Sequence, residues 1–162
     1  MNLLFLHGLE SKPGGRKSQF LKSCGHLVIN PALPRETFEI SKKITQDVID
    51  FGGTAFDVIV GSSRGGAVGM SVATRQAGLV LVAPAWKKYV SASDLKDWSS
   101  RVDPSNTFIL HSEKDEVVPF QDSQELAEKY GIKLINVGRC HRMNDDDALE
   151  ALADVTKWLK KS

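Results

Sequence analysis

The sequence predicts an α/β fold in three layers, in which helices cover both faces of a mostly parallel sheet of about six strands. Two observations indicate this architecture. Short apolar runs alternate with longer amphipathic segments, and several of the runs are continuously apolar, as in central strands covered on both faces. Strands that alternate with helices indicate right-handed crossovers between parallel strands. The 162 residues suffice for one substantial core, so we expect residues 1–162 to form a single domain.

Each expected strand is one of the short apolar runs, taken in chain order. These runs cover residues 3–6, 26–30, 57–60, 79–83, 107–111 and 133–137.

The expected helices lie between these runs. In segment 39–51, Ile40, Ile44, Val48 and Phe51 recur at three- and four-residue steps, which places them on one helical face. Segment 145–160 opens with three aspartates and is followed by lysines, an order that suits the helix dipole. Further helices are expected over residues 18–24, 65–76 and 121–130, and a short one near 93–98 in the irregular segment 84–105.

Charge and cysteine content narrow the class of protein. Lysine and arginine number 21 against 20 acidic residues, so no basic excess indicates nucleic acid as a partner. The two cysteines, Cys24 and Cys140, suit a reduced cytoplasmic chain, although the sequence leaves a disulfide between them open. The first apolar run is too short for a signal peptide, and no stretch approaches the ~20 apolar residues of a membrane span. We therefore expect a cytoplasmic protein without a membrane span, and the oligomeric state is not predicted.

A Gly-x-Ser-x-Gly pentapeptide, Gly61-Ser62-Ser63-Arg64-Gly65, stands between an apolar run and a helix rich in small residues. A sharp turn from strand to helix crowds the backbone two residues before and after its central serine, and glycine removes the clash. The turn exposes the serine at the N-terminus of the following helix, where an oxyanion is stabilised. Ser63 is the candidate nucleophile, and Ser62 lacks glycines at the same spacing.

A base and an acid follow in the chain order that a serine nucleophile needs. His141 lies after the last expected strand, where Gly138 permits a tight turn, and an imidazole titrates in the range useful for activating a hydroxyl. His111 is the alternative base. Asp115 is the candidate acid that orients the imidazole, because the Val-Val-Pro sequence that follows indicates a loop turning inward. Glu113 and Glu116 are chemical rivals for this role.

The first strand runs into His7-Gly8-Leu9, a turn that can present a backbone N–H to the serine. The expected oxyanion donors are the amides of Leu9 and Arg64. His7, Gly8 and Trp86 are the candidates for contact with substrate.

The same loop continues as Pro13-Gly14-Gly15-Arg16-Lys17-Ser18, which looks like a phosphate-binding loop. Arg16 separates the glycine from Lys17-Ser18, and Pro13 removes an amide donor, so nucleotide binding is not expected. Arg16 and Lys17 remain candidates for attracting an anionic substrate.

Together these motifs resemble the α/β-hydrolase family, and in size the chain resembles compact, lid-poor bacterial serine esterases. The resemblance implies Ser63 as nucleophile, Asp115 as acid and His141 as base. The chain is shorter than many members, so a large cap is expected to be missing and only residues 84–105 are left to act as a cover. Arg64 is bulkier than many residues that follow the nucleophile, and its side chain is therefore expected to influence substrate choice.

The sequence thus predicts hydrolysis of a small-molecule ester or thioester through an acyl-serine, without metal or cofactor, because the histidines and cysteines lack zinc-like spacing. A peptidase or an acyltransferase would use the same residues. The competing class is a non-catalytic binding or scaffold protein on the same fold, with Trp86, Tyr89 and Trp98 as an exposed protein-binding patch.

Overall fold

A computed structural model describes residues 1–161 of the chain. Within these residues six strands form one sheet in the order β2-β1-β3-β4-β5-β6, and every neighbouring pair is parallel. The expectation of a mostly parallel sheet of six strands is confirmed. The strands are β1 Asn2–Leu6, β2 Leu27–Ile29, β3 Val58–Ser62, β4 Gly78–Val82, β5 Thr107–His111 and β6 Lys133–Asn136.

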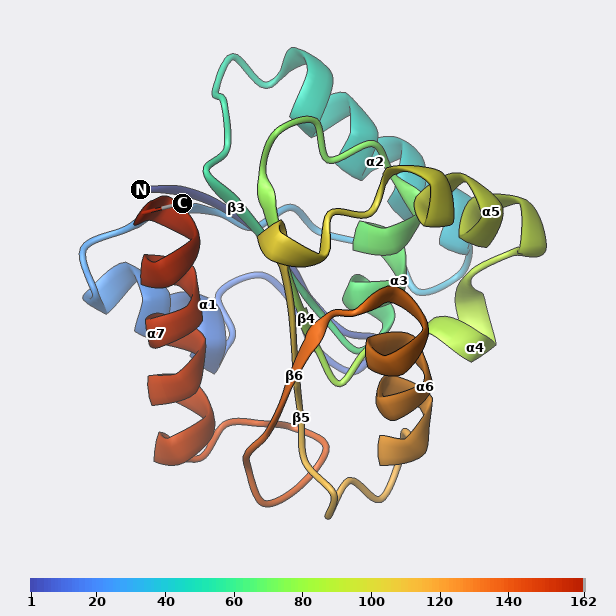
Figure 1. The fold of residues 1–162 in the computed structure, drawn as a ribbon. Helices are drawn as coiled ribbons and strands as arrows, with labels where there is room; N and C mark the ends of the chain where they lie inside the picture. The colour runs from blue at the N-terminus through green and yellow to red at the C-terminus, as the bar shows by residue number, and fades with distance from the viewer. Residues whose placement is uncertain (162) are drawn as a thin grey trace.

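Helices cover both faces of the sheet, which gives the three layers that the sequence predicted (Figure 1). On one face α1 (Arg16–Ser23) and α7 (Asp146–Lys161) pack against alternate strand residues such as Leu3 and Val80. On the other face the neighbouring residues, such as Leu4 and Leu79, meet the remaining large helices. These are α2 Phe38–Phe51, α3 Arg64–Ser71, α5 Ala92–Arg101 and α6 Phe120–Tyr130.

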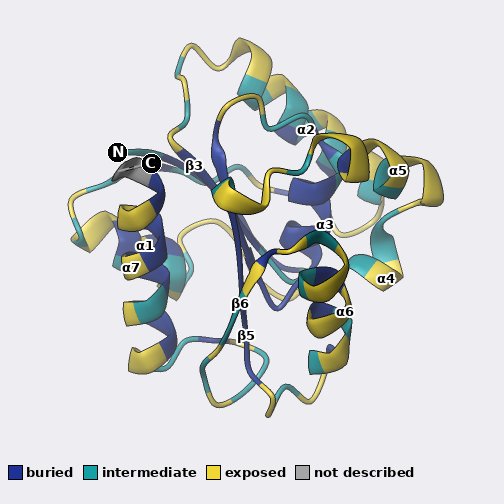
Figure 2. Ribbon diagram, viewed as in Figure 1, coloured by how far each residue is buried: buried dark blue, intermediate teal, exposed yellow. Residues whose placement is uncertain are grey.

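Burial follows the same two-sided pattern (Figure 2). The central strands β3, β4 and β5 are buried almost throughout, whereas the helices expose the faces turned away from the sheet. Continuously apolar strands are therefore explained by helices on both sides.

Helix α3 ends at Ser71, earlier than the helix expected over residues 65–76. Val72 adopts an extended conformation, with φ −119° and ψ 158°, and is buried in the core. The side-chain amide of Gln46 then pairs with both backbone groups of Ala73, at 2.8 Å to its N–H and 3.3 Å to its carbonyl oxygen. A tertiary contact with α2 thus replaces the helical hydrogen bonds.

Segment 84–105 folds into α4 (Trp86–Tyr89), α5 and the 3₁₀ turn η1 (Pro104–Asn106). Trp98 of α5 is only 1% exposed and packs edge-on against Tyr130, with ring centroids 4.9 Å apart. Trp86 and Tyr89 are partly buried. The three aromatic residues therefore do not form the exposed patch that the competing interpretation as a binding protein assumed.

Two smaller expectations concern the cysteines and the membrane. Cys24 and Cys140 are both free, so the disulfide that the sequence left open is not formed. In residues 1–161 no helix combines the length and the apolar character needed to cross a membrane.

Candidate active site

Ser63 occupies a sharp turn between β3 and α3. Its φ of 54° and ψ of −115° lie outside the regions that a side chain other than glycine prefers. The strained turn is held by main-chain hydrogen bonds, from Ser63 N–H to the Val82 carbonyl at 2.8 Å and from Ala85 N–H to the Ser63 carbonyl at 3.1 Å. Strain of this kind persists where the surrounding structure enforces it, and it holds the serine at the end of the strand.

The flanking glycines are required by close backbone contacts. A Cβ atom on Gly61 would lie 2.5 Å from the carbonyl oxygen of Gly65, across the turn. A Cβ atom on Gly65 would lie 2.1 Å from the carbonyl oxygen of Leu6, at the end of β1. The two glycines thus allow α3 to begin in close contact with the ends of β1 and β3, as in a nucleophile elbow.

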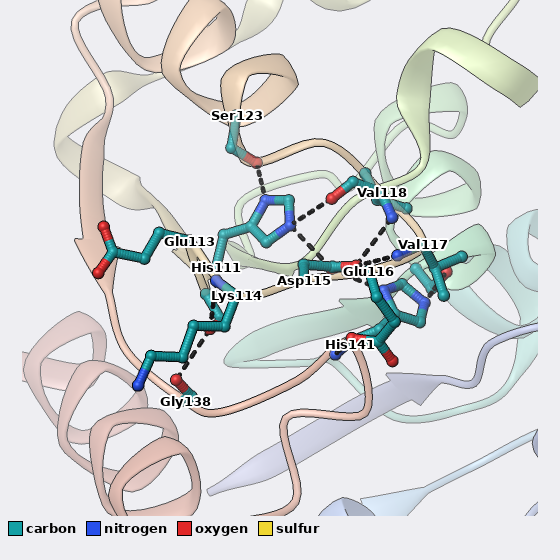
Figure 3. A network of polar contacts seen from close by, with 12 residues as sticks. His111, Glu113, Lys114, Asp115, Glu116, Val117, Val118, Ser123, Gly138 and His141 are labelled. Atoms are coloured by element: carbon teal, nitrogen blue, oxygen red, sulfur yellow. Dashed lines mark hydrogen bonds and ion pairs between the residues drawn. The ribbon is translucent and has the colours of Figure 1, made fainter.

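The structure brings Ser63, His141 and Asp115 together. His141 Nε2 is 3.0 Å from Ser63 Oγ, and His141 Nδ1 is 2.7 Å from Asp115 Oδ2. Asp115 lies in the loop after β5, and His141 in the loop between β6 and α7 (Figure 3). The Asp115 side chain is fully buried, whereas the His141 side chain is 17% exposed. The orienting carboxylate is thus shielded, and the imidazole stays open to a reactant.

The Asp115 carboxylate accepts four hydrogen bonds. Oδ1 accepts from the amides of Val117 and Val118 at 2.7 and 2.8 Å. Oδ2 lies 2.9 Å from His111 Nε2 in addition to its contact with His141. Burial alone would raise the pKa of the Asp115 carboxyl, but the bonds from both histidines and both amides outweigh burial and hold this pKa well below its usual range. Asp115 is therefore a carboxylate at neutral pH.

His111 is completely buried beside the acid. Its Nε2 faces two acceptors, Asp115 Oδ2 and, at 3.2 Å, the carbonyl oxygen of Val118, so this nitrogen carries a proton. Its Nδ1 lies 2.7 Å from Ser123 Oγ of α6 (Figure 3). Sequence reasoning considered His111 only as an alternative base. Its position as the last residue of β5, four residues before Asp115, was the available signal for a contact with the acid.

The rival residues are placed apart from these contacts. Glu116 accepts the backbone N–H of His141 through Oε2 at 3.1 Å, and thus holds the loop rather than the ring. The Glu113 side chain points away from Asp115 (Figure 3). Ser62 belongs to β3 and pairs in register with Val82.

The loop after β1 passes directly beside the serine. A Cβ atom on Gly8 would lie 3.4 Å from the Cβ of Ser63. Leu33 N–H donates to His7 Nε2 at 3.0 Å, so the proton is on His7 Nδ1, which donates to the Gly8 carbonyl at 2.8 Å. Because the peptide bond between Gly8 and Leu9 is trans, the Leu9 N–H points to the side opposite the Gly8 carbonyl oxygen. His7 is buried with both ring nitrogens occupied, so its ring shapes this loop instead of offering a nitrogen to substrate.

The second expected donor, the Arg64 amide, is the first of α3, and the first amides of a helix have no partner within it. The Arg64 side chain, in contrast, is 2% exposed. Its guanidinium donates to Ser41 Oγ at 3.0 Å and to the Pro34 carbonyl at 2.9 Å, beneath the site. The expectation that this side chain influences substrate choice is therefore not supported.

Trp86 connects two helices. Its indole N–H donates to the Asp122 carbonyl of α6 at 3.0 Å, and its ring packs against the core. Contact of Trp86 or Gly8 with substrate stays a prediction. Among residues 1–161, no group of three or more His, Cys, Asp and Glu side chains is arranged as a metal site would be.

The parallel three-layer sheet and its nucleophile elbow define the α/β-hydrolase class. The family model described as "Serine hydrolase" matches residues 57–161. The chain belongs to this serine hydrolase family. A search of curated proteins found no match.

Solved structures of several hydrolases share the fold. A protein from Thermoplasma acidophilum described as a predicted CIB-like hydrolase aligns with a TM-score of 0.76 at 21% identity, over 99% of this chain and 86% of that one. An esterase domain from a Rhodothermus marinus protein gives 0.76 at 15% identity, over 99% and 86%. A monoacylglycerol lipase from Paleococcus ferrophilus gives 0.72 at 15% identity, over 99% and 94%. These likenesses establish the fold.

Proposed function

We propose that this serine hydrolase cleaves carboxylic esters or thioesters through an acyl-serine intermediate on Ser63. One observation carries the proposal: the chain of contacts from Ser63 Oγ to His141 Nε2 at 3.0 Å and from His141 Nδ1 to Asp115 Oδ2 at 2.7 Å. A hydroxyl needs a base within hydrogen-bond reach to act as a nucleophile, and the base needs an oriented imidazole.

The reaction proceeds in two halves. As Ser63 Oγ attacks the carbonyl carbon, its proton passes to His141 Nε2, and the amides of Leu9 and Arg64 bind the developing oxyanion. The tetrahedral intermediate collapses when His141 gives this proton to the departing alcohol or thiol. In the second half His141 takes a proton from water, which attacks the acyl group, and then returns a proton to Ser63 as the acid product leaves.

Asp115 supports both halves. Its carboxylate accepts the Nδ1 proton of His141, which leaves Nε2 facing the serine. Since the pKa of Asp115 lies below its usual range, the carboxylate stays charged and stabilises the imidazolium that forms during each transfer.

Several observations support an ester substrate in particular. The size of the chain resembles that of compact esterases, and two proteins of similar fold are called an esterase domain and a monoacylglycerol lipase. A peptidase or an acyltransferase would use the same groups. We further propose that residues 1–162 act as one domain on a small-molecule substrate, without nucleic acid. Free Cys24 and Cys140 agree with a reducing, cytoplasmic setting.

A fluorophosphonate probe tests the nucleophile. The probe should label the parent chain and the Ser62→Ala variant, which keeps the adjacent hydroxyl as a control, but not Ser63→Ala. Turnover of p-nitrophenyl esters and thioesters of graded chain length then identifies the substrate class. A folded parent chain that takes no label and hydrolyses none of the esters would point to a non-catalytic binding protein instead.

A further inference from the structure

Arg16 and Lys17, at the start of α1, reach across to the loop that carries His141. Lys17 Nζ donates to the carbonyl oxygen of Arg142 and, at 3.1 Å, to Asn144 Oδ1. Arg16 Nε donates to the carbonyl oxygen of Asn144 at 2.9 Å. The two side chains that resembled part of a phosphate-binding loop thus bind protein oxygens more than 120 positions away in sequence.

The partners of Lys17 are neutral oxygens. Within residues 1–161 no carboxylate lies within ion-pair distance of its ammonium. Burial lowers the pKa of Lys17 to about 8, and the nearby Cys140 sulfur opposes this effect only in part. Because burying an ammonium is unfavourable unless its donors are used, the directed hydrogen bonds are the evident role of this side chain.

The loop between β6 and α7 needs anchors because His141 must meet two partners at once. It has no regular secondary structure between residues 137 and 145. On the N-terminal side of the imidazole, the Glu116 carboxylate accepts the backbone N–H of His141. On the C-terminal side, Lys17 binds the main-chain carbonyl of the next residue, Arg142, and the side chain of Asn144.

We propose that Lys17, assisted by Arg16, is a positioning residue for His141: it fixes the loop after the base, so that the imidazole reaches Ser63 and Asp115 together. This inference depends on the proposed function for its kinetic effect. Since a displacement of about 1 Å can cost about 10²-fold in rate, loss of the anchor should lower kcat more than it raises KM.

The test compares Lys17→Met with Lys17→Arg and with Lys22→Met, an exposed lysine on the same helix as the matched control. At equal folded fraction, we expect Lys17→Met to slow fluorophosphonate labelling and to lower kcat for p-nitrophenyl acetate by about 10- to 100-fold, with KM changed less than threefold. Lys17→Arg, which still donates to both oxygens, should recover most of the rate. Lys22→Met should match the parent.

A readout without activity separates this proposal from the proposed function. The Nδ1–H proton of His141, assigned by its loss in His141→Ala, should give a resolved downfield NMR signal in the parent. We expect the signal to broaden or disappear in Lys17→Met and to persist in Lys22→Met. Asn144→Ala removes one acceptor of Lys17 and keeps the lysine, so it should also broaden the signal. This variant replaces Lys17→Met in the test if Lys17→Met does not fold. Parental kinetics together with a parental signal in Lys17→Met or Asn144→Ala would overturn the proposal, and an unreactive parent with the expected signals would overturn the proposed function alone.

Discussion

His111 and His141 lie within hydrogen-bond distance of the same oxygen, Asp115 Oδ2, at 2.9 and 2.7 Å. The two imidazoles differ in exposure. His111 is completely buried and reaches Ser123 through its other nitrogen, whereas His141 is partly exposed and reaches Ser63. One carboxylate is thus held by one histidine and orients the other.

This arrangement predicts a structural role for His111. His111→Leu removes one bond to the buried carboxylate and leaves Ser123 without its partner, so the free energy of unfolding should fall by about 1–3 kcal/mol. Urea denaturation measures this change. Activity per folded molecule should fall less than in Asp115→Ala, because the bond between Asp115 and His141 remains. An equal loss of activity in the two variants would mean that His111 does more than hold the acid.

The lowered pKa of Asp115 predicts that the free energy of unfolding decreases at low pH. Because this pKa is lower in the folded chain than the ordinary value of 3.8, the unfolded chain binds more protons between the two values. The contribution of Asp115 to stability is therefore present above about pH 5 and is lost as the pH falls through the folded-state pKa.

Asp115→Asn removes this titration and serves as the comparison. It should be less stable than the parent at neutral pH, and its unfolding free energy should decrease less between pH 6 and pH 3. Urea denaturation at several pH values gives both slopes. Parallel slopes would show that the carboxylate does not titrate as described.

Removal of the base should abolish turnover without unfolding the chain. His141→Ala is expected to lower kcat by about 10⁴-fold or more, because an unassisted hydroxyl is a poor nucleophile. Hydrolysis of p-nitrophenyl acetate measures the loss, and circular dichroism checks the fold. Glu113→Gln and Glu116→Gln are the controls for the acid, and we expect both to retain far more activity than Asp115→Asn. Parental turnover in His141→Ala would show that another residue is the base.

Two of the three glycines of α3, Gly65 and Gly69, provide a matched pair that tests the elbow. A Cβ atom at Gly65 would meet the backbone oxygens of Leu6 and His7 at 2.1 and 2.7 Å, and backbone atoms cannot move aside cheaply. Gly65→Ala should therefore destabilise the chain by at least about 2 kcal/mol. At Gly69 the nearest atom would be Leu79 Cδ1 at 3.3 Å, the end of a side chain, and alanine favours the helix, so Gly69→Ala should change stability by no more than about 1 kcal/mol. Thermal unfolding of both variants tests this difference, and equal effects would contradict the close approach.

Local patterns were enough to predict most of the architecture. Continuous apolar runs identify the buried strands, since both faces of each strand meet helices. The helical spacing of Ile40, Ile44, Val48 and Phe51 indicates α2, but only Ile44 and Val48 pack against the core, and Ile40 and Phe51 are exposed. Glycines at positions 61 and 65 identify the elbow because the backbone crowding that requires them arises within the pentapeptide and its neighbouring strand. The early end of α3 was not predictable in this way, since it depends on Gln46 of another helix.

By itself the sequence determined the succession of strands and helices along the chain. It also placed Ser63, Asp115 and His141 beyond the carboxyl ends of strands, because both features depend on periodicity and short spacing. Only the tertiary structure decided how side chains pair across long separations. Ser63 and His141 are 78 positions apart, and Lys17 is 125 from Arg142. The tertiary structure placed His111 against Asp115, turned the Arg64 side chain inward and directed Lys17 to the loop that carries His141. Such pairings depend on which strand ends become neighbours in the sheet and on which rotamers fit in the packed interior. A local sequence pattern encodes neither the neighbours nor the rotamers.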